Sequence, residues 1–315
     1  MNQFEHLVAA TFTPMHDDGR VNLSVIPAYA EHLLAMGVTG IFVCGTTGES
    51  SSLSVEERKE VAAEWVRVAQ GRLRVIIHVG ANALPDCIAL SEHAAAIGAD
   101  AVSTTPPSYF KPATNDALVD WCRQIAAAAG KLPFYFYHIP SLTGVTLPML
   151  DLLRESRENI PTLAGIKYTH GNLMEFQRCL AFDPDRFEVY FGFDEMLLPA
   201  LAVGTKGAVG STYNYAGPLY QRMIDAFHQG DLATARAWSK RTIEMIAVLL
   251  EFGGLPAGKA ILNMQGIDTG PVRSPLVSLS PQRTVALHAR LMEAGFDAQA
   301  IAREARALQL TEKAR

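Results

Sequence analysis

The sequence predicts an α/β fold, a (β/α)8 TIM barrel with additional C-terminal helices. Eight short segments rich in β-forming residues recur before residue 213, and helical patterns lie between most of them in this chain of 315 residues. Strands that alternate with helices pair in parallel through βαβ units. A closed barrel of eight such units usually takes about 250 residues, so the chain is long enough for one.

The predicted strands share β-branched and aromatic residues and short apolar runs. They are residues 7–13, 40–45, 74–80, 100–105, 133–138, 163–168, 187–192 and 207–212. The helix signals between them are clear. Ser54 begins a helical pattern in which Glu57 completes a capping box and Gly71 marks the end. Two further patterns, residues 84–98 and 115–130, end at Gly98 and Gly130.

An open, doubly wound sheet is the alternative arrangement of such units. The first predicted strand is not followed by a GxGxxG loop, and the chain does not divide into two similar halves. We therefore expect residues 1–215 to form the barrel strands and helices. We expect residues 216–315 to form the last barrel helix and an appended helical bundle, with helical patterns at 218–230, 231–253 and 280–295. No low-complexity linker separates the two parts.

Composition argues against several classes of partner. The net charge is −5 and no basic stripe is present, so nucleic acid is not an expected partner. The longest apolar runs fall short of the roughly 20 residues that span a bilayer, and the N-terminal segment lacks the pattern of a signal peptide. The four cysteines show no CxxC spacing, which favours a reduced, cytoplasmic protein. The nine histidines show no HExxH spacing, so we expect no metal and no cofactor.

A lysine stands at the end of a predicted strand in "AGIKYTH". Lys167 is the one strand-end lysine, because the other seven fall on predicted helices or loops. Barrel chemistry lies at the C-terminal ends of the strands. Burial there would destabilise the ammonium, and a neutral amine could attack a carbonyl to form an iminium. The alternative is an ordinary solvated lysine.

Two neighbours strengthen this hypothesis. Tyr137 ends the preceding predicted strand, where its hydroxyl could move protons. The "GTTGES" turn offers Thr46 and Thr47 beside two glycines, a pattern that suits a small carboxylate. Together they suggest a 2-oxo acid held as a Schiff base. The alternatives are a core tyrosine, an ordinary turn and, for Asp194 in "GFDE", a cap on the helix that follows.

The segments "GTTGES", "YHIPSLTG" and "GIKYTHG" resemble the signature segments of the N-acetylneuraminate lyase and dihydrodipicolinate synthase superfamily. The resemblance runs from about Leu7 to about Pro275. It implies a homotetramer in which Lys167 forms the Schiff base and Tyr137 handles protons. It also implies that Thr46 and Thr47 bind the carboxylate, and that Tyr109 reaches toward a neighbouring subunit's site. The sugar pocket would be lined by Thr169, Gly192, Asp194, Glu195 and Ser211.

One position separates the branches of this superfamily. The synthase branch carries an arginine where this chain has Leu142, and leucine cannot grip a second carboxylate. The resemblance therefore implies a pyruvate-dependent aldolase that acts on a small-molecule 2-oxo sugar acid, with N-acetylneuraminate as its substrate. The alternatives are a related 2-keto-3-deoxy sugar acid aldolase or dehydratase, a dihydrodipicolinate synthase-like enzyme, a non-catalytic 2-oxo acid sensor and a two-carboxylate glycosidase. The last is disfavoured because Asp194 and Glu195 are adjacent.

Overall fold

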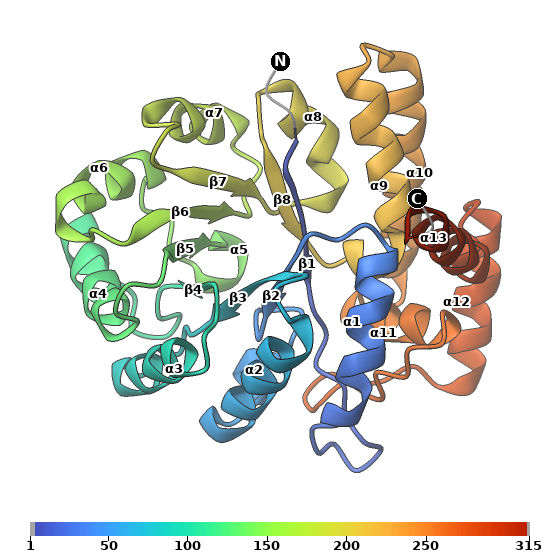
Figure 1. The fold of residues 1–315 in the computed structure, drawn as a ribbon, viewed down its shortest axis with the longest axis horizontal. Coiled ribbons are helices and arrows are strands. Elements are labelled where there is room, and N and C mark those ends of the chain that lie inside the picture. Colours follow the sequence, from blue (N-terminus) through green and yellow to red (C-terminus); the bar gives the residue numbers. More distant parts are fainter. Residues whose placement is uncertain (1–3, 314–315) are drawn as a thin grey trace.

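The computed structural model describes residues 4–313 and shows a closed barrel of eight parallel strands in chain order, β1 to β8 (Figure 1). The last strand pairs with the first, His6 opposite Gly207. The barrel prediction is confirmed, and every strand lies within or one residue outside its predicted segment. The strands are β1 (His6–Ala10), β2 (Gly40–Val43), β3 (Arg74–His78), β4 (Ala101–Thr104), β5 (Phe134–His138), β6 (Leu163–Tyr168), β7 (Glu188–Phe191) and β8 (Gly207–Gly210).

The outer helices begin and end at the predicted signals. In α2 the Ser54 hydroxyl accepts from the Glu57 amide at 3.1 Å, and the Ser54 amide donates to the Glu57 carboxylate at 2.8 Å. This reciprocal pair is the predicted capping box. The helices between strands are α1 (Ile26–Ala35), α2 (Val55–Ala69), α3 (Leu84–Ala96), α4 (Asn115–Ala128), α5 (Pro140–Thr143), α6 (Met149–Asn159), α7 (Leu173–Phe182) and α8 (Leu197–Ala202), with the short turns η1 (Leu23–Val25), η2 (Ser50–Ser52) and η3 (Asp194–Met196).

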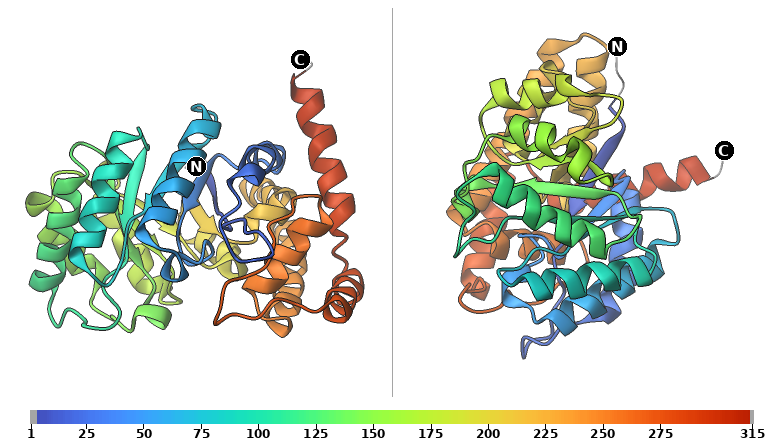
Figure 2. Two further views of the ribbon diagram at one scale, coloured as in Figure 1. Left: turned by 90° about the horizontal axis from the view of Figure 1, so that it is seen from below. Right: turned by 90° about the vertical axis from the view of Figure 1, so that its left-hand side faces the viewer.

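Five helices follow the barrel strands and gather on one side of the barrel, beside α1 (Figure 1). They are α9 (Tyr213–His228), α10 (Leu232–Glu251), α11 (Leu255–Met264), α12 (Pro281–Glu293) and α13 (Ala298–Lys313). The helix α9 bends at Ala216, where its backbone leaves helical geometry. The three predicted patterns correspond to α9, α10 and α12, whereas neither α11 nor α13 was among them. Figure 2 shows α13 running out from the barrel edge, and it packs on α1 and α9.

The barrel interior is closed at its N-terminal end by a polar network. Arg74 donates to Glu188, Tyr190 and Tyr135 at 3.1, 2.8 and 2.8 Å. Both tyrosine hydroxyls also donate to Glu188 at 2.6 Å. Above this layer lie apolar side chains such as Val8, and the cavity described below opens at the other end. The network thus forms the floor of the barrel, and the apolar layer separates it from the C-terminal strand ends where chemistry is expected.

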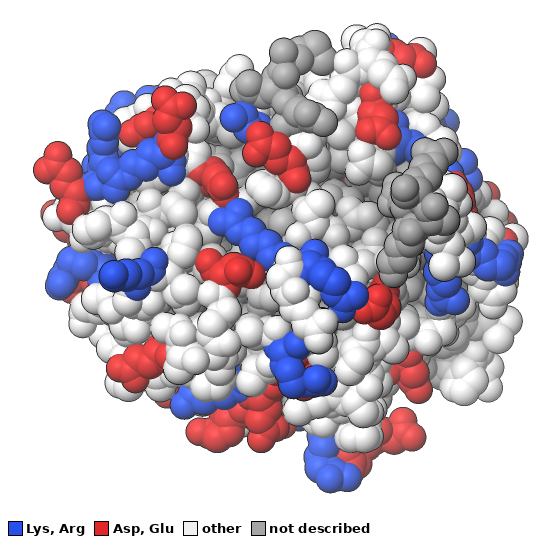
Figure 3. All heavy atoms as spheres, in the orientation of Figure 1, with Lys and Arg blue, Asp and Glu red and all other residues white. Residues whose placement is uncertain are grey.

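The surface carries mixed charge. On the face in Figure 3, acidic and basic side chains are interspersed rather than gathered by sign. Among residues 4–313, no single helix is long and apolar enough to cross a membrane; only α10 and α11 taken together pass by length and composition, and they are bent by 114° at their break. Within the same range, no group of three or more His, Cys, Asp or Glu side chains could hold a metal ion.

Candidate active site

Lys167 lies inside the barrel mouth and not in solvent. Its strand β6 pairs with β5 so that Lys167 stands level with Tyr137, and the residue is only 4% exposed. Its Nζ lies 4.1 Å from the centroid of the Tyr137 ring and 4.1 Å from that of Phe42. Burial lowers the pKa of Lys167 below its ordinary value, although Tyr137 and Asp194 act in the opposite direction. The amine therefore has the environment that favours its neutral, nucleophilic form.

Tyr137 is held by aromatic neighbours. It is buried at the end of β5, and its ring meets Phe42 and His78 edge to face at centroid distances of 5.5 and 6.1 Å. Because two edge-to-face contacts restrict the rotation of the ring, the side chain stays beside the Lys167 amine. The predicted pairing of a strand-end lysine with the tyrosine of the preceding strand is present in the structure.

The "GTTGES" segment forms a tight loop after β2. The Glu49 amide donates to the Thr46 carbonyl at 3.0 Å and the Ser50 amide to the Gly45 carbonyl at 3.3 Å. Two residues that are not glycine, Cys44 and Glu49, adopt left-handed backbone angles with φ of 55° and 56°. Such strain persists where the surroundings impose it and is common at functional sites.

A cavity of about 520 Å³, its open mouth included, joins these parts. It brings together nearly all of the predicted site residues at the ends of β2, β5, β6, β7 and β8. Glu195 and Thr46 are exposed at its rim, whereas Thr47 is buried. The lining residues are Ala10, Thr46, Thr47, Tyr137, Lys167, Gly192, Phe193, Asp194, Glu195, Val209, Gly210 and Ser211.

Asp194 presents one carboxylate oxygen without a partner. Its Oδ2 accepts from the Thr212 amide and hydroxyl at 2.8 and 2.7 Å, while Oδ1 is buried and unpaired among the described residues. Burial raises the pKa of Asp194 to about 6. The suggestion that Asp194 caps the helix after it is wrong, because its bonds go to Thr212, at the start of α9. A Cβ on Gly210 would overlap Oδ1, so glycine is required there.

Two predicted residues lie elsewhere. Thr169 is buried just behind the cavity wall and does not line it; a Cβ on Gly192 would overlap its hydroxyl, which has no partner. Tyr109 lies between β4 and α4, is 79% exposed and does not line the cavity of its own chain. Its ring meets Phe110 edge to face, and its amide donates to Asn82 at 3.3 Å.

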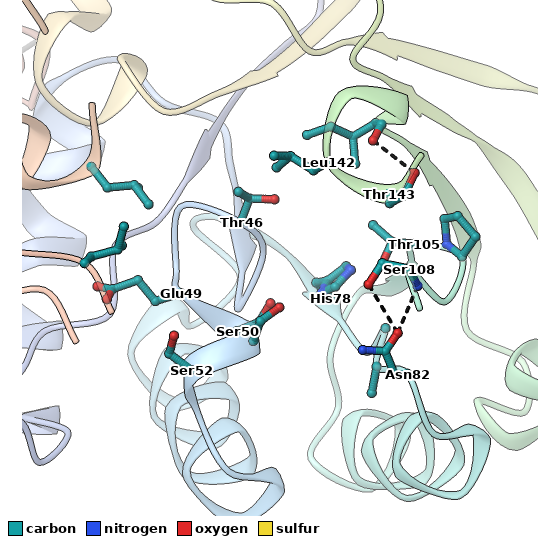
Figure 4. A pocket seen from close by; sticks show the side chains of 17 residues that line it. Thr46, Glu49, Ser50, Ser52, His78, Asn82, Thr105, Ser108, Leu142 and Thr143 are labelled. Atoms are coloured by element: carbon teal, nitrogen blue, oxygen red, sulfur yellow. Dashed lines mark hydrogen bonds between the residues drawn. The ribbon is translucent and has the colours of Figure 1, made fainter. Parts of the chain in front are cut away.

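A second hollow of about 850 Å³ lies beside the first and shares Thr46 with it (Figure 4). His78 forms part of its wall and is buried; its Nδ1 lies 3.0 Å from the Cys44 carbonyl, whereas Nε2 has no partner. Burial, with the nearby Arg58 guanidinium, holds the pKa of His78 well below its ordinary value, so the ring is neutral. Leu142, the position that separates the branches, lines this hollow and is 61% exposed.

Sequence reasoning missed a buried lysine behind the "GTTGES" loop. Lys259 of α11 is 2% exposed and its Nζ lies 3.0 Å from the carboxylate of Glu49. The available signal was a lysine inside the apolar pattern "LPAGKAIL", where an unpaired charge would be unfavourable.

Comparison with known proteins identifies the family to which this chain belongs. Residues 3–294 match the dihydrodipicolinate synthetase family. The N-acetylneuraminate lyase of Xenopus tropicalis is 48% identical over 276 residues, which cover 86% of this chain and 90% of the relative. The solved N-acetylneuraminate lyase of Proteus mirabilis is 42% identical, with a TM-score of 0.91, over 94% of this chain and 100% of that one. A solved catalytic lysine mutant of Ruminococcus gnavus sialic acid aldolase is 28% identical, with a TM-score of 0.87, over 93% and 97%. The chain therefore belongs to the dihydrodipicolinate synthetase family.

Proposed function

We propose that this protein is a Schiff-base-forming aldolase that cleaves N-acetylneuraminate to N-acetylmannosamine and pyruvate. One observation carries the proposal: a buried lysine of lowered pKa stands level with Tyr137, in a cavity that is also lined by Thr46, Thr47, Asp194 and Glu195. The identity to N-acetylneuraminate lyases over most of the chain supports the choice of substrate.

The first half of the reaction forms the iminium. The neutral Nζ of Lys167 attacks the C2 carbonyl carbon of the open-chain sugar acid, and the carbinolamine that results loses water. The Tyr137 hydroxyl supplies and accepts the protons of this step, since it ends the strand beside Lys167. Thr46 and Thr47 hold the substrate carboxylate next to the reacting carbon.

The second half breaks the carbon–carbon bond. The Tyr137 hydroxyl gives its proton to the water that departs in the first half and is left as the phenolate. As the C4 hydroxyl loses its proton to this phenolate, the electrons of the C3–C4 bond move into the iminium and N-acetylmannosamine leaves as the aldehyde. The enamine that remains is protonated at C3, and water hydrolyses the iminium to release pyruvate and the free amine of Lys167. The unpaired Oδ1 of Asp194 and the exposed Glu195 accept hydroxyl groups of the sugar chain, because a carboxylate oxygen can take two such bonds.

We further propose a cytoplasmic homotetramer. The four cysteines are free and buried, which fits a reducing compartment. The exposed Tyr109 and Phe110, at 79% and 85%, offer apolar surface that a neighbouring subunit would cover.

Reductive trapping tests the function directly. Borohydride added with pyruvate is expected to fix a covalent adduct on Lys167, located by peptide mass spectrometry. Lys167→Ala should form none and lose turnover. Cleavage of N-acetylneuraminate is then compared with cleavage of 2-keto-3-deoxygluconate. Label on a different lysine would refute the role of Lys167, and faster cleavage of the shorter sugar acid would refute the substrate.

A further inference from the structure

The "GTTGES" loop is held in place by contacts between Glu49 and the C-terminal part of the chain. The side chain of Glu49 is 1% exposed and extends away from His78 toward the C-terminal segment (Figure 4). One of its carboxylate oxygens lies 3.0 Å from the Lys259 ammonium, and the other accepts from the Arg273 amide at 2.8 Å. Both partners belong to the chain after the barrel, more than 200 residues beyond the loop.

Lys259 joins three segments at one point. Besides its ion pair with Glu49, its ammonium donates to the Thr13 carbonyl at 2.9 Å and to the Pro271 carbonyl at 2.6 Å. Thr13 in turn donates through its hydroxyl to the carbonyl of Gly48, inside the loop, at 2.8 Å. The segment just after β1, the loop and the segment after α11 are therefore fixed relative to one another.

Arg273 fastens the far side of the same loop. Its guanidinium donates to both carboxylate oxygens of Glu57 at 2.7 Å and to the Ser52 carbonyl at 2.7 Å. The C-terminal segment thus contacts the chain just after Glu49 as well as Glu49 itself.

Two physical arguments give this pair a role beyond general stability. A charge as buried as that of Lys259 or Glu49 is tolerated only when it is paired, so the two side chains must stay together. The loop between the two left-handed residues Cys44 and Glu49 needs an outside restraint to hold its backbone angles. Thr46 and Thr47 lie between those two residues and face the Lys167 cavity.

We propose that Glu49 and Lys259 are positioning residues that set the place of Thr46 and Thr47, and so the affinity of the site for the carboxylate of its keto acid. The proposal rests on the proposed function, in which Thr46 and Thr47 hold that carboxylate. It gives Lys259 of α11 a part in positioning the site, although no residue of that helix lines the Lys167 cavity.

The test compares Glu49→Gln, Lys259→Met, the double variant and a matched control. Gln265→Leu is the control, because Gln265 ends the same helix, is buried, and donates to the Tyr215 and Ala298 carbonyls at 2.9 Å without touching the loop. For each protein we measure the melting temperature and the pyruvate concentration that half-saturates borohydride trapping. We also measure kcat and KM for N-acetylneuraminate, and amide hydrogen exchange of residues 45–50.

Lys259→Met leaves the Glu49 carboxylate buried and unpaired, so its melting temperature should fall furthest; the double variant should recover much of the loss. The double variant should still need about tenfold more pyruvate to half-saturate trapping, which corresponds to losing about one hydrogen bond from the threonines to the pyruvate carboxylate. Its kcat should stay within about twofold of wild type. Its loop amides should exchange faster. Gln265→Leu should lose stability but keep wild-type pyruvate affinity and loop exchange.

Two results would overturn the inference alone: wild-type pyruvate affinity in the double variant, or an equal loss of affinity in Gln265→Leu. If the wild-type protein itself formed no adduct with pyruvate, the proposed function and this inference would fall together.

Discussion

At the scale of single residues, the pKa of Asp194 gives the site a pH dependence. Burial raises that pKa to about 6, so the carboxylate gains a proton as the pH falls below 6. A protonated carboxyl accepts sugar hydroxyls less well, because bonds to a charged group are the stronger ones. We predict that KM for N-acetylneuraminate rises between pH 7 and pH 5 while half-saturation by pyruvate changes little.

Asp194→Asn checks this assignment. Its KM at pH 7 should be roughly 10- to 100-fold higher, the loss of one hydrogen bond to a charged acceptor. The KM of the variant should also be flat across the same pH range. The free energy of unfolding offers an independent check. Because the folded pKa of Asp194 is raised, this residue's contribution to the free energy of unfolding should fall as the pH rises from about 4 to about 6. A wild-type KM that does not vary from pH 5 to pH 7 would rule out Asp194 as the titrating group.

Gly210 offers a second residue-scale prediction. A Cβ at this position would overlap Oδ1 of Asp194, so Gly210→Ala must displace the carboxylate. We expect it to raise KM for the sugar acid about as much as Asp194→Asn does, while trapping of pyruvate persists. Gly171→Ala is the matched control, since a Cβ there meets nothing within 4 Å. Steady-state kinetics of both variants decide the point, and an unchanged KM in Gly210→Ala would contradict it.

At the scale of elements, the polar layer at the N-terminal ends of β3, β5 and β7 should matter for stability and not for catalysis. Arg74→Met removes three donated hydrogen bonds from a half-buried network. We predict a loss of about 1–3 kcal/mol in the free energy of unfolding, with kcat and KM within about twofold of wild type. Denaturant titration and steady-state kinetics measure the two effects. A large change in kcat with unchanged stability would contradict this separation of floor and mouth.

The elements were predictable where the signal is local. The Ser54–Glu57 cap and the alternation of strands with helices depend on residues a few positions apart, and the structure has both. The helix α11 begins after Gly254, a residue with positive φ, and its pattern holds the buried Lys259, so its apolar face was hidden in the sequence. Thr169 was expected to line the pocket, but the lining at this point is Gly192, and the Thr169 hydroxyl lies where a Cβ on Gly192 would be.

At the scale of the whole molecule, the limit of sequence reasoning is the distance along the chain. Lys167 and Tyr137 could be paired in advance because strands β5 and β6 are consecutive and parallel. The pairing of Glu49 with Lys259 joins residues 210 apart, and no local pattern brings them together. Such contacts follow from how the C-terminal helices return to the barrel, which only the tertiary structure defines.

Tyr109 raises the question of whether one chain holds a complete site. It is 79% exposed and lies outside the cavity of its own chain, so a role in proton transfer requires a neighbouring subunit. We predict a homotetramer, with a mass in sedimentation four times that of the 34.2 kDa chain. We also predict that Lys167→Ala and Tyr109→Phe complement each other when coexpressed with different tags.

In a mixed assembly, the intact Lys167 of one chain would lie beside the intact Tyr109 of the other. Doubly tag-purified assemblies should therefore turn over faster than the average of the two parent variants, because each parent lacks one half of every site. Assemblies of Tyr109→Phe with wild-type chains serve as the control for the effect of mixing itself. Turnover equal to the parental average would show that Tyr109 acts within its own chain or not at all.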